Sequence, residues 1–217
     1  MTDLAATTYK RLPEDERRQS LIEATIRCLS AFGLSGTTVR KIAQEAEVAP
    51  NLITHHFSDK KTLIGATYRY LAEKYHRNYL AASEAAGTHP VDQLKAYIGS
   101  AFRVETLDPE ILRVWTSFWT LALTDHDSIA ARVHIETAGQ TRAYLKQLLR
   151  NVLTMKKRSF DEPEIHDLAI AITSLVDGMW LTWGLDPNLF DAQRGRRIAF
   201  DMLASRLAIP EISDSAE

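Results

Sequence analysis

Side chains that could bind a polyanion are concentrated between residues 37 and 64, in the string TTVRKIAQEAEVAPNLITHHFSDKKTLI. Its apolar residues recur at helical spacing. The positions between them carry hydrogen-bond donors, which are Arg40, Lys41, Asn51, Thr54, His55, His56, Lys60 and Lys61. An outward face of donors is what a phosphate backbone requires, and Asn and Arg are also suited to reading adenine and guanine. We therefore expect this segment to bind double-stranded DNA.

The tryptophans form a second group with possible chemistry. They occur as two pairs at helical spacing, and Asp177 lies one turn before Trp180, on the same helix face. Several aromatic faces and one carboxylate can hold a quaternary ammonium ion, which binds through its charge and its methyl groups. We expect a ligand cage that includes Trp115, Phe118, Trp119, Asp177, Trp180 and Trp183. The alternative is that these aromatic residues fill a core or a subunit interface.

Patterns that would indicate an enzyme are missing. His126 lies between Asp125 and Asp127, and the simplest interpretation of this cluster is a helix cap. The other histidines show no metal-binding spacing, and neither a phosphate loop nor a nucleophile elbow is present. Cys28 is the single cysteine, so a thiolate zinc cluster cannot form within the chain. We expect no catalytic residue, no metal and no cofactor.

Composition describes an ordinary globular chain. Its 217 residues are 45% hydrophobic and 25% charged, and the formal net charge is −2 with a pI near 6.4. This charge does not by itself indicate a nucleic-acid partner, so DNA binding has to depend on where the donors lie. Neither an apolar run of roughly 20 residues nor the apolar core of a signal peptide is evident. We expect a cytoplasmic protein.

Three short helices must position the donors. The first is expected to begin near Pro13 and to end at Gly33, with Leu21, Thr25, Cys28, Leu29 and Phe32 on its packing face. A second follows residues 36–38, with Val39, Ile42, Ala43 and Ala46 inward. A tight turn through residues 47–49 leads to a third helix, from Pro50 to about His56, with Ile53 and Phe57 inward. Two short helices joined by a tight turn predict a helix-turn-helix.

The rest of the chain is also expected to be helical. Ser58 is expected to cap a long helix from Asp59 to about Ala86, whose packing stripe is Leu63, Thr67, Tyr70 and Leu71. Further helices are predicted at 91–106, 109–124, 126–155, 163–185 and 191–208, between short tails at 1–12 and 211–217. No strand pattern is found. The prediction is an all-α fold of about nine helices, with a DNA-binding head at 1–61 and a ligand-binding and dimerisation body at 62–217.

The head resembles the tetracycline-repressor (TetR) family of bacterial regulators. The resemblance lies in T-T-V-x-x-I-A-x-x-A-x-V followed by I-x-H-H-F-x-x-K, over about 50 residues. It implies that Lys60 and His56 contact phosphates, that Thr38 contacts the DNA backbone, and that the remaining contacts come from Arg40, Pro50, Asn51, Thr54 and His55. It also implies repression from a roughly palindromic operator.

Three residues depart from the family pattern. Glu47 stands where glycine is usual in the turn and puts a negative charge near DNA. Ala49 replaces a serine that often caps the next helix. Thr54 stands where a phosphate-binding tyrosine is frequent. These changes are expected to weaken or redirect DNA binding without removing the motif.

The body is similar to the BetI-like subgroup of that family, which responds to choline. The similar strings are VWTSFWTLAL and LVDGMWLTWGL. The resemblance implies a small-molecule effector and a homodimer formed by the helices at 163–185 and 191–208. The first carries the small residues Ala169, Ala171, Ser174 and Gly178, and the second offers Ile198, Met202 and Leu203. Two alternatives remain: a regulator with another apolar or aromatic-caged ligand, or a helical interaction module that does not bind DNA.

Overall fold

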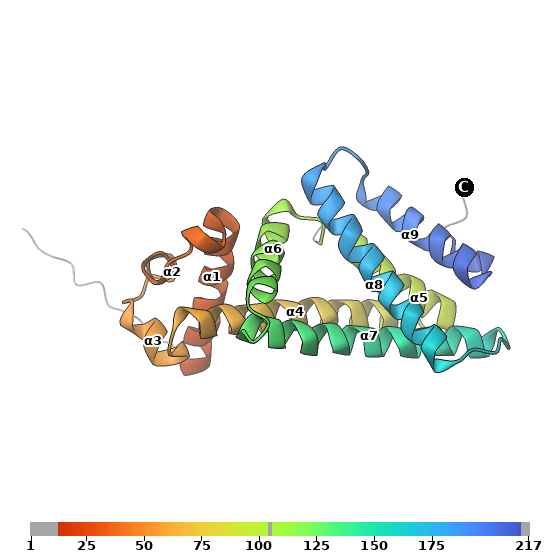
Figure 1. The fold of residues 1–217 in the computed structure, drawn as a ribbon, viewed down its shortest axis with the longest axis horizontal. Helices are drawn as coiled ribbons and strands as arrows, with labels where there is room; N and C mark the ends of the chain where they lie inside the picture. Colours follow the sequence, from red (N-terminus) through yellow and green to blue (C-terminus); the bar gives the residue numbers. More distant parts are fainter. Residues whose placement is uncertain (1–12, 104–105, 214–217) are drawn as a thin grey trace, which may run out of the picture. The chain divides into compact units, whose positions relative to one another are not determined.

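The fold is all-helical in a computed structural model that describes residues 13–103 and 106–213 (Figure 1). Over these residues it contains nine α-helices, two short 3₁₀ helices and no strand, which confirms the predicted fold class. The chain divides into two compact units between Thr67 and Tyr68. This division falls inside α4 (Lys60–Ala85), later than the expected boundary at residues 61 and 62. The tail at 1–12 lies outside the described residues.

The first unit is built from α1 (Glu14–Gly36), α2 (Val39–Glu45), α3 (Asn51–Phe57) and the first turns of α4. Helix α1 is interrupted at Gly33, which has a φ of 63°, so the expected end of the helix is a kink in the structure. The buried cluster of this unit is Leu21, Ala24, Cys28, Ile42, Ala43, Ile53, Phe57 and Leu63. Most of the positions expected to face inward therefore do so.

Phe32 was expected in this core, and that expectation is wrong. The side chain is 50% exposed, and the ammonium of Lys41 lies 3.8 Å from the centre of its ring. A cation over an aromatic face is an attractive contact. Lys41 is consequently engaged with the protein itself and is a poorer candidate for phosphate binding than its exposed neighbour Arg40.

The start of α4 is capped by Asp59 and not by Ser58. The Asp59 carboxylate accepts a hydrogen bond of 2.7 Å from the backbone N–H of Thr62. Ser58 has a φ of 65°, and its backbone N–H closes the end of α3 by donating to the Thr54 carbonyl. The predicted cap is one residue too early because Ser58 is used to end the preceding helix.

The second unit contains the rest of α4 and five further α-helices. They are α5 (Pro90–Gly99), α6 (Pro109–Thr124), α7 (Ile129–Met155), α8 (Glu162–Leu185) and α9 (Ala192–Leu207), with η1 (Ser100–Phe102) after α5 and η2 (Pro210–Ile212) after α9. The helix predicted at 91–106 is shorter, because its end becomes η1; residues 104 and 105 of that prediction lie outside the described residues. The expected C-terminal tail contains η2, and its last residues, 214–217, are also outside them.

The polar cluster before α7 is a cap, as its sequence indicates. The Asp125 carboxylate accepts from the backbone N–H of Asp127, and the Ser128 hydroxyl accepts from that of Ala131. Helix α7 therefore begins at Ile129, later than the predicted residue 126.

Helix α7 is the centre of the second unit. Helices α5, α6 and α8 pack against it, and α4 lies alongside it in Figure 1. Arg69 of α4 joins it through two hydrogen bonds to the Glu136 carboxylate, of 2.6 and 2.7 Å. The largest side chain that α4 buries fully here is Tyr68, which is 1% exposed. The sequence predicted Tyr70 instead, which is only half-buried.

Helix α8 is strongly apolar, yet little of it is buried within its own chain. By length and a mean hydropathy of 1.4, this helix could cross a membrane. The sequence was expected to hold no apolar run of that length. Only 22% of the most apolar 18-residue stretch of α8 is buried inside the chain. Ile170, Leu181 and Leu185 are among its exposed side chains.

Candidate functional site

The first unit presents the expected donors on one stretch of the chain, from the start of α2 to the start of α4. Thr38, Arg40, Asn51, Thr54 and His55 are exposed, while His56 and Lys60 are half-buried. Pro50, which was expected to contact DNA without being a donor, is also exposed. Thr38 is the N-cap of α2, and its hydroxyl accepts from the backbone N–H of Lys41 at 3.2 Å. Exposure makes these side chains available to DNA, and contact with it remains a prediction.

His56 is fixed by a residue that the sequence did not single out. The Arg18 guanidinium donates to the His56 carbonyl oxygen and lies 4.3 Å from the centre of the Phe57 ring. Burial lowers the pKa of His56, and the neighbouring His55 acts in the same direction. The ring is therefore neutral at neutral pH, and it can offer a phosphate an N–H group but no positive charge.

The turn between α2 and α3 explains why glycine is favoured in it. Glu47 has a φ of 53°, in the left-handed region that costs a residue with a Cβ atom free energy. The Val48 N–H then bonds to the Ala43 carbonyl at 2.9 Å. Helix α3 has no side-chain cap, consistent with alanine at position 49. The turn is formed in spite of both departures.

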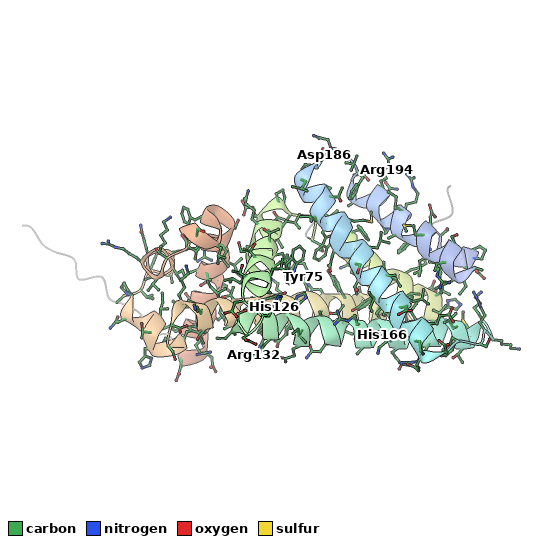
Figure 2. All side chains as sticks on the ribbon, viewed as in Figure 1. Tyr75, His126, Arg132, His166, Asp186 and Arg194 are labelled. Carbon is green, nitrogen blue, oxygen red and sulfur yellow. The ribbon has the colours of Figure 1, made fainter. Side chains whose placement is uncertain are left out.

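The second unit encloses a cavity of about 240 Å³ between α4, α6, α7 and α8. Its walls are largely aromatic: Tyr68, Tyr75 and Tyr79 from α4, Trp115 and Trp119 from α6, and Trp180 from α8. Tyr75 lies edge-to-face with Trp115 at 5.8 Å and with Trp180 at 6.4 Å between ring centres. Figure 2 shows Tyr75 in the space between α6 and α8. Edge-to-face packing of this kind makes a rigid aromatic wall.

The structure brings only part of the predicted cage together. Trp115, Trp119, Asp177 and Trp180 line the cavity. Phe118 lies behind it and stacks on Tyr68, with ring centres 4.4 Å apart and planes 7° apart. Trp183 is half-buried and does not line the cavity.

Several lining residues were missed by the sequence analysis. The tyrosines of α4 recur at positions 68, 75 and 79, which places them on one face, and that spacing could have revealed them. The polar lining residues His76, His134 and Arg142 carry no comparable signal, because each is separated from the others and from the tryptophans along the sequence.

The Asp177 carboxyl is open to the cavity and nevertheless surrounded by protein. Burial raises its pKa to about 6, and the charge of Arg142 acts in the opposite direction. The residue is exposed to solvent that enters the cavity. Its pKa is nevertheless raised, because many protein atoms surround the carboxyl group. At neutral pH the carboxyl is mostly ionised and supplies a negative charge to an aromatic cavity.

The two histidines of the cavity are neutral at neutral pH. Burial lowers the pKa of both His76 and His134. The Tyr68 hydroxyl and His134 Nδ1 share a hydrogen bond of 2.7 Å, which fixes the orientation of both rings. Burial raises the pKa of Tyr68 above its ordinary value and that of Tyr75 to about 12, so the tyrosines add no charge.

Both units of the chain match known protein families. Residues 21–67 match the family of bacterial regulatory proteins called tetR, and residues 90–208 match the C-terminal family of BetI-type transcriptional repressors. The chain belongs to the BetI-type branch of the TetR family. It is thus a helix-turn-helix transcriptional regulator and not an enzyme. Regulators of this family bind DNA operators and small-molecule effectors, usually as dimers.

Individual relatives cover nearly the whole chain. The chain is 28% identical to the HTH-type transcriptional regulator BetI of Stenotrophomonas maltophilia, over 91% of this chain and 96% of the relative. A crystal structure of a candidate transcriptional regulator from Pseudomonas aeruginosa PAO1 is 32% identical, with a TM-score of 0.83 over 94% of this chain and 96% of that one. A regulator from Saccharomonospora viridis, solved in complex with choline, shares the fold with a TM-score of 0.74 at 16% identity, over 87% of this chain and 96% of that one.

Proposed function

We propose that this regulator is a repressor that binds a palindromic operator as a homodimer and is released by a small quaternary ammonium compound such as choline. The observation that carries the choice of effector is one carboxylate, that of Asp177, in a cavity walled by Trp115, Trp119 and Trp180. A quaternary ammonium ion forms no hydrogen bonds, so aromatic faces and a negative charge are the groups that attract it.

The size of the cavity agrees with a small effector. Its volume of about 240 Å³ lies below the roughly 300–1,000 Å³ of pockets for drug-sized ligands. The relative from Saccharomonospora viridis binds choline within the same fold, which supports this class of compound. An effector of another class with an apolar or aromatic body remains the alternative.

The donors of the first unit support DNA as the macromolecular partner. Arg40, Asn51 and His55 are exposed, and Lys60 begins α4. In our proposal, α3 enters the major groove and Lys60 and His56 hold phosphates on either side of it. Two copies would then read the two halves of a palindrome.

The apolar surface of α8 and α9 supports a homodimer. A groove of about 320 Å³ runs between these helices, and its apolar lining includes the more exposed Leu175 and Met202. Leu168, Ile172 and Leu203 also line it but are buried within their own chain. The exposed small residues Ala171, Ser174 and Gly178 permit close approach of a second helix, whereas Ala169 is fully buried in its own chain and cannot contribute. Covering this surface with a second copy removes apolar area from water. Such a dimer would act in the cytoplasm, where the DNA lies.

Helix α4 is one continuous helix that carries residues of both the proposed DNA-binding surface and the effector cavity. It carries Lys60 at its start and Tyr68, Tyr75 and Tyr79 in the wall of the cavity. We propose that the effector binds better to a conformation in which the DNA-binding residues of the two subunits no longer match the operator spacing. The difference in affinity between the two conformations sets the size of the response.

The experiment measures operator binding and intrinsic tryptophan fluorescence while choline is titrated. Operator fragments are first selected from the source genome with the full-length protein. We expect choline to change the fluorescence and to weaken operator affinity by about 5-fold to 150-fold. If choline changes neither, the choice of effector is wrong. If no duplex is bound in a salt-sensitive manner, the helical interaction module becomes the better description.

A further inference from the structure

Arg142 places a positive charge in the lining of the cavity, which would not help to bind a simple cation. Its side chain reaches the cavity from α7 and is half-buried. In the part of the chain that the structure describes, its guanidinium forms neither an ion pair nor a hydrogen bond. It acts on Asp177 and His134 only through its charge, across a longer distance. Its nitrogen atoms are not buried, so the five N–H donors of the guanidinium are open to the cavity and available to an acceptor on a ligand.

Other donors around the cavity are also unsatisfied. Trp115 Nε1, Tyr79 Oη and His76 Nδ1 are buried with no hydrogen-bond partner among the described residues. Indole N–H is a donor only, and phenolic O–H can donate, so both require an acceptor. A quaternary ammonium group has no acceptor to offer them.

The charges that line the cavity balance each other. Asp177 supplies one negative charge at neutral pH and Arg142 one positive charge, while His76 and His134 are neutral. A purely cationic ligand meets one attractive and one repulsive group in this arrangement. A ligand that carries both charges meets an opposite charge at each end.

We infer that the preferred effector is a small zwitterion, with a quaternary ammonium group held by Asp177 and the tryptophans and a carboxylate held by the Arg142 guanidinium. This inference rests on the proposed function and makes it more specific. Arginine suits the second role because its planar fork can donate two parallel hydrogen bonds to a carboxylate.

The test compares trimethylglycine with choline, which share the trimethylammonium group and differ in carrying a carboxylate or a hydroxymethyl group. Dissociation constants are measured by calorimetry on the full-length protein at neutral pH. We expect trimethylglycine to bind at least about tenfold more tightly than choline, as a charge-assisted hydrogen bond implies. In Arg142→Gln we expect that preference to disappear, with choline binding equally well or better.

Two further variants keep the result interpretable. Arg142→Lys retains the charge and loses the fork, so it should bind trimethylglycine with intermediate affinity. Arg132→Gln alters an exposed arginine of the same helix that does not line the cavity and is labelled in Figure 2, and it should behave as the unaltered protein. If the unaltered protein binds choline as tightly as trimethylglycine, the inference is overturned and the proposed function stands. If neither compound binds, both are overturned.

Discussion

The carboxyl of Asp177 has a property that a sequence comparison would not reveal, since burial raises its pKa to about 6. Only the ionised carboxylate attracts a quaternary ammonium ion. Protonation therefore competes with the ligand as the pH falls through 6. Burial lowers the pKa of His76 and His134 and raises that of Tyr68 and Tyr79, so the two tyrosines stay neutral.

We expect choline affinity to be constant above about pH 7 and to fall by up to about tenfold per unit below pH 6. Asp177→Asn should bind choline more weakly and should lose this pH dependence. Calorimetric titrations of both proteins between pH 5 and 8 provide the measurement. An equal pH dependence in the variant would assign the effect to the histidines instead.

Glu47 is a second residue whose role depends on its backbone. Its φ of 53° carries a strain that glycine would not have, and its carboxylate lies in the turn that precedes α3. We expect Glu47→Gly to stabilise the first unit by up to about 1 kcal/mol, because the relieved strain exceeds the extra chain entropy of glycine.

The two contributions of Glu47 can be separated. Glu47→Gln keeps the strained backbone and removes the charge. Both variants should therefore bind operator DNA more tightly, whereas only Glu47→Gly should unfold at a higher temperature. Operator titrations and thermal unfolding give the two readouts. An unchanged operator affinity in both variants would place the carboxylate away from the DNA.

At the scale of elements, the caps show how closely helix boundaries depend on single side chains. Asp59 accepts the Thr62 N–H and begins α4, while Ser58 ends α3 with a positive φ. The same hydrogen bond lowers the pKa of Asp59. A lowered carboxyl pKa stabilises the folded state above the unfolded pKa and loses that contribution as the pH falls.

We expect Asp59→Ala to unfold at a lower temperature than the unaltered protein at pH 7, and the difference to shrink as the pH falls below about 4. Ser58→Ala is the matched control, because its hydroxyl caps neither helix, and it should unfold like the unaltered protein. Thermal unfolding followed by circular dichroism at several pH values distinguishes them. A larger loss in Ser58→Ala would restore Ser58 as the cap.

Packing on α4 illustrates the limit of periodicity. The pattern correctly placed Leu63, Thr67 and Leu71 inward and chose Tyr70 over Tyr68. A helix that contacts partners on more than one side has no single apolar stripe. Tyr68 is buried because Phe118 stacks on it and His134 bonds to its hydroxyl, and both partners are distant in sequence.

At the scale of the whole molecule, α8 has an apolar surface that its own chain leaves uncovered. The homodimer proposed above would cover it. Met202 is 54% exposed and lies in the groove between α8 and α9. Introducing a carboxylate there on both copies would place like charges in an apolar contact.

We expect Met202→Glu to sediment as a monomer and to lose operator affinity, because a single head makes half of the contacts. Leu123→Glu is a suitable control, since Leu123 is 74% exposed on α6 and lines neither the groove nor the aromatic cavity. That variant should remain a dimer. Sedimentation of a dimeric Met202→Glu protein would show that the subunits meet elsewhere.

The sequence by itself determined the all-helical fold, most of the helix positions and the family, because these follow from local spacing. Periodicity in the string from Thr37 to Ile64 places the buried residues inward, although Lys41, His56 and Lys60 are only half-exposed on its outward face. The tryptophan pairs identified α6 and α8 as walls of the cavity. Only the tertiary structure decided which side chains meet. It placed Phe118 and Trp183 outside the lining, and it added the three tyrosines of α4, whose shared face the spacing could have shown. It also added His76, His134 and Arg142, for which the sequence carries no signal, because the cavity is formed by faces of four helices that are distant in sequence.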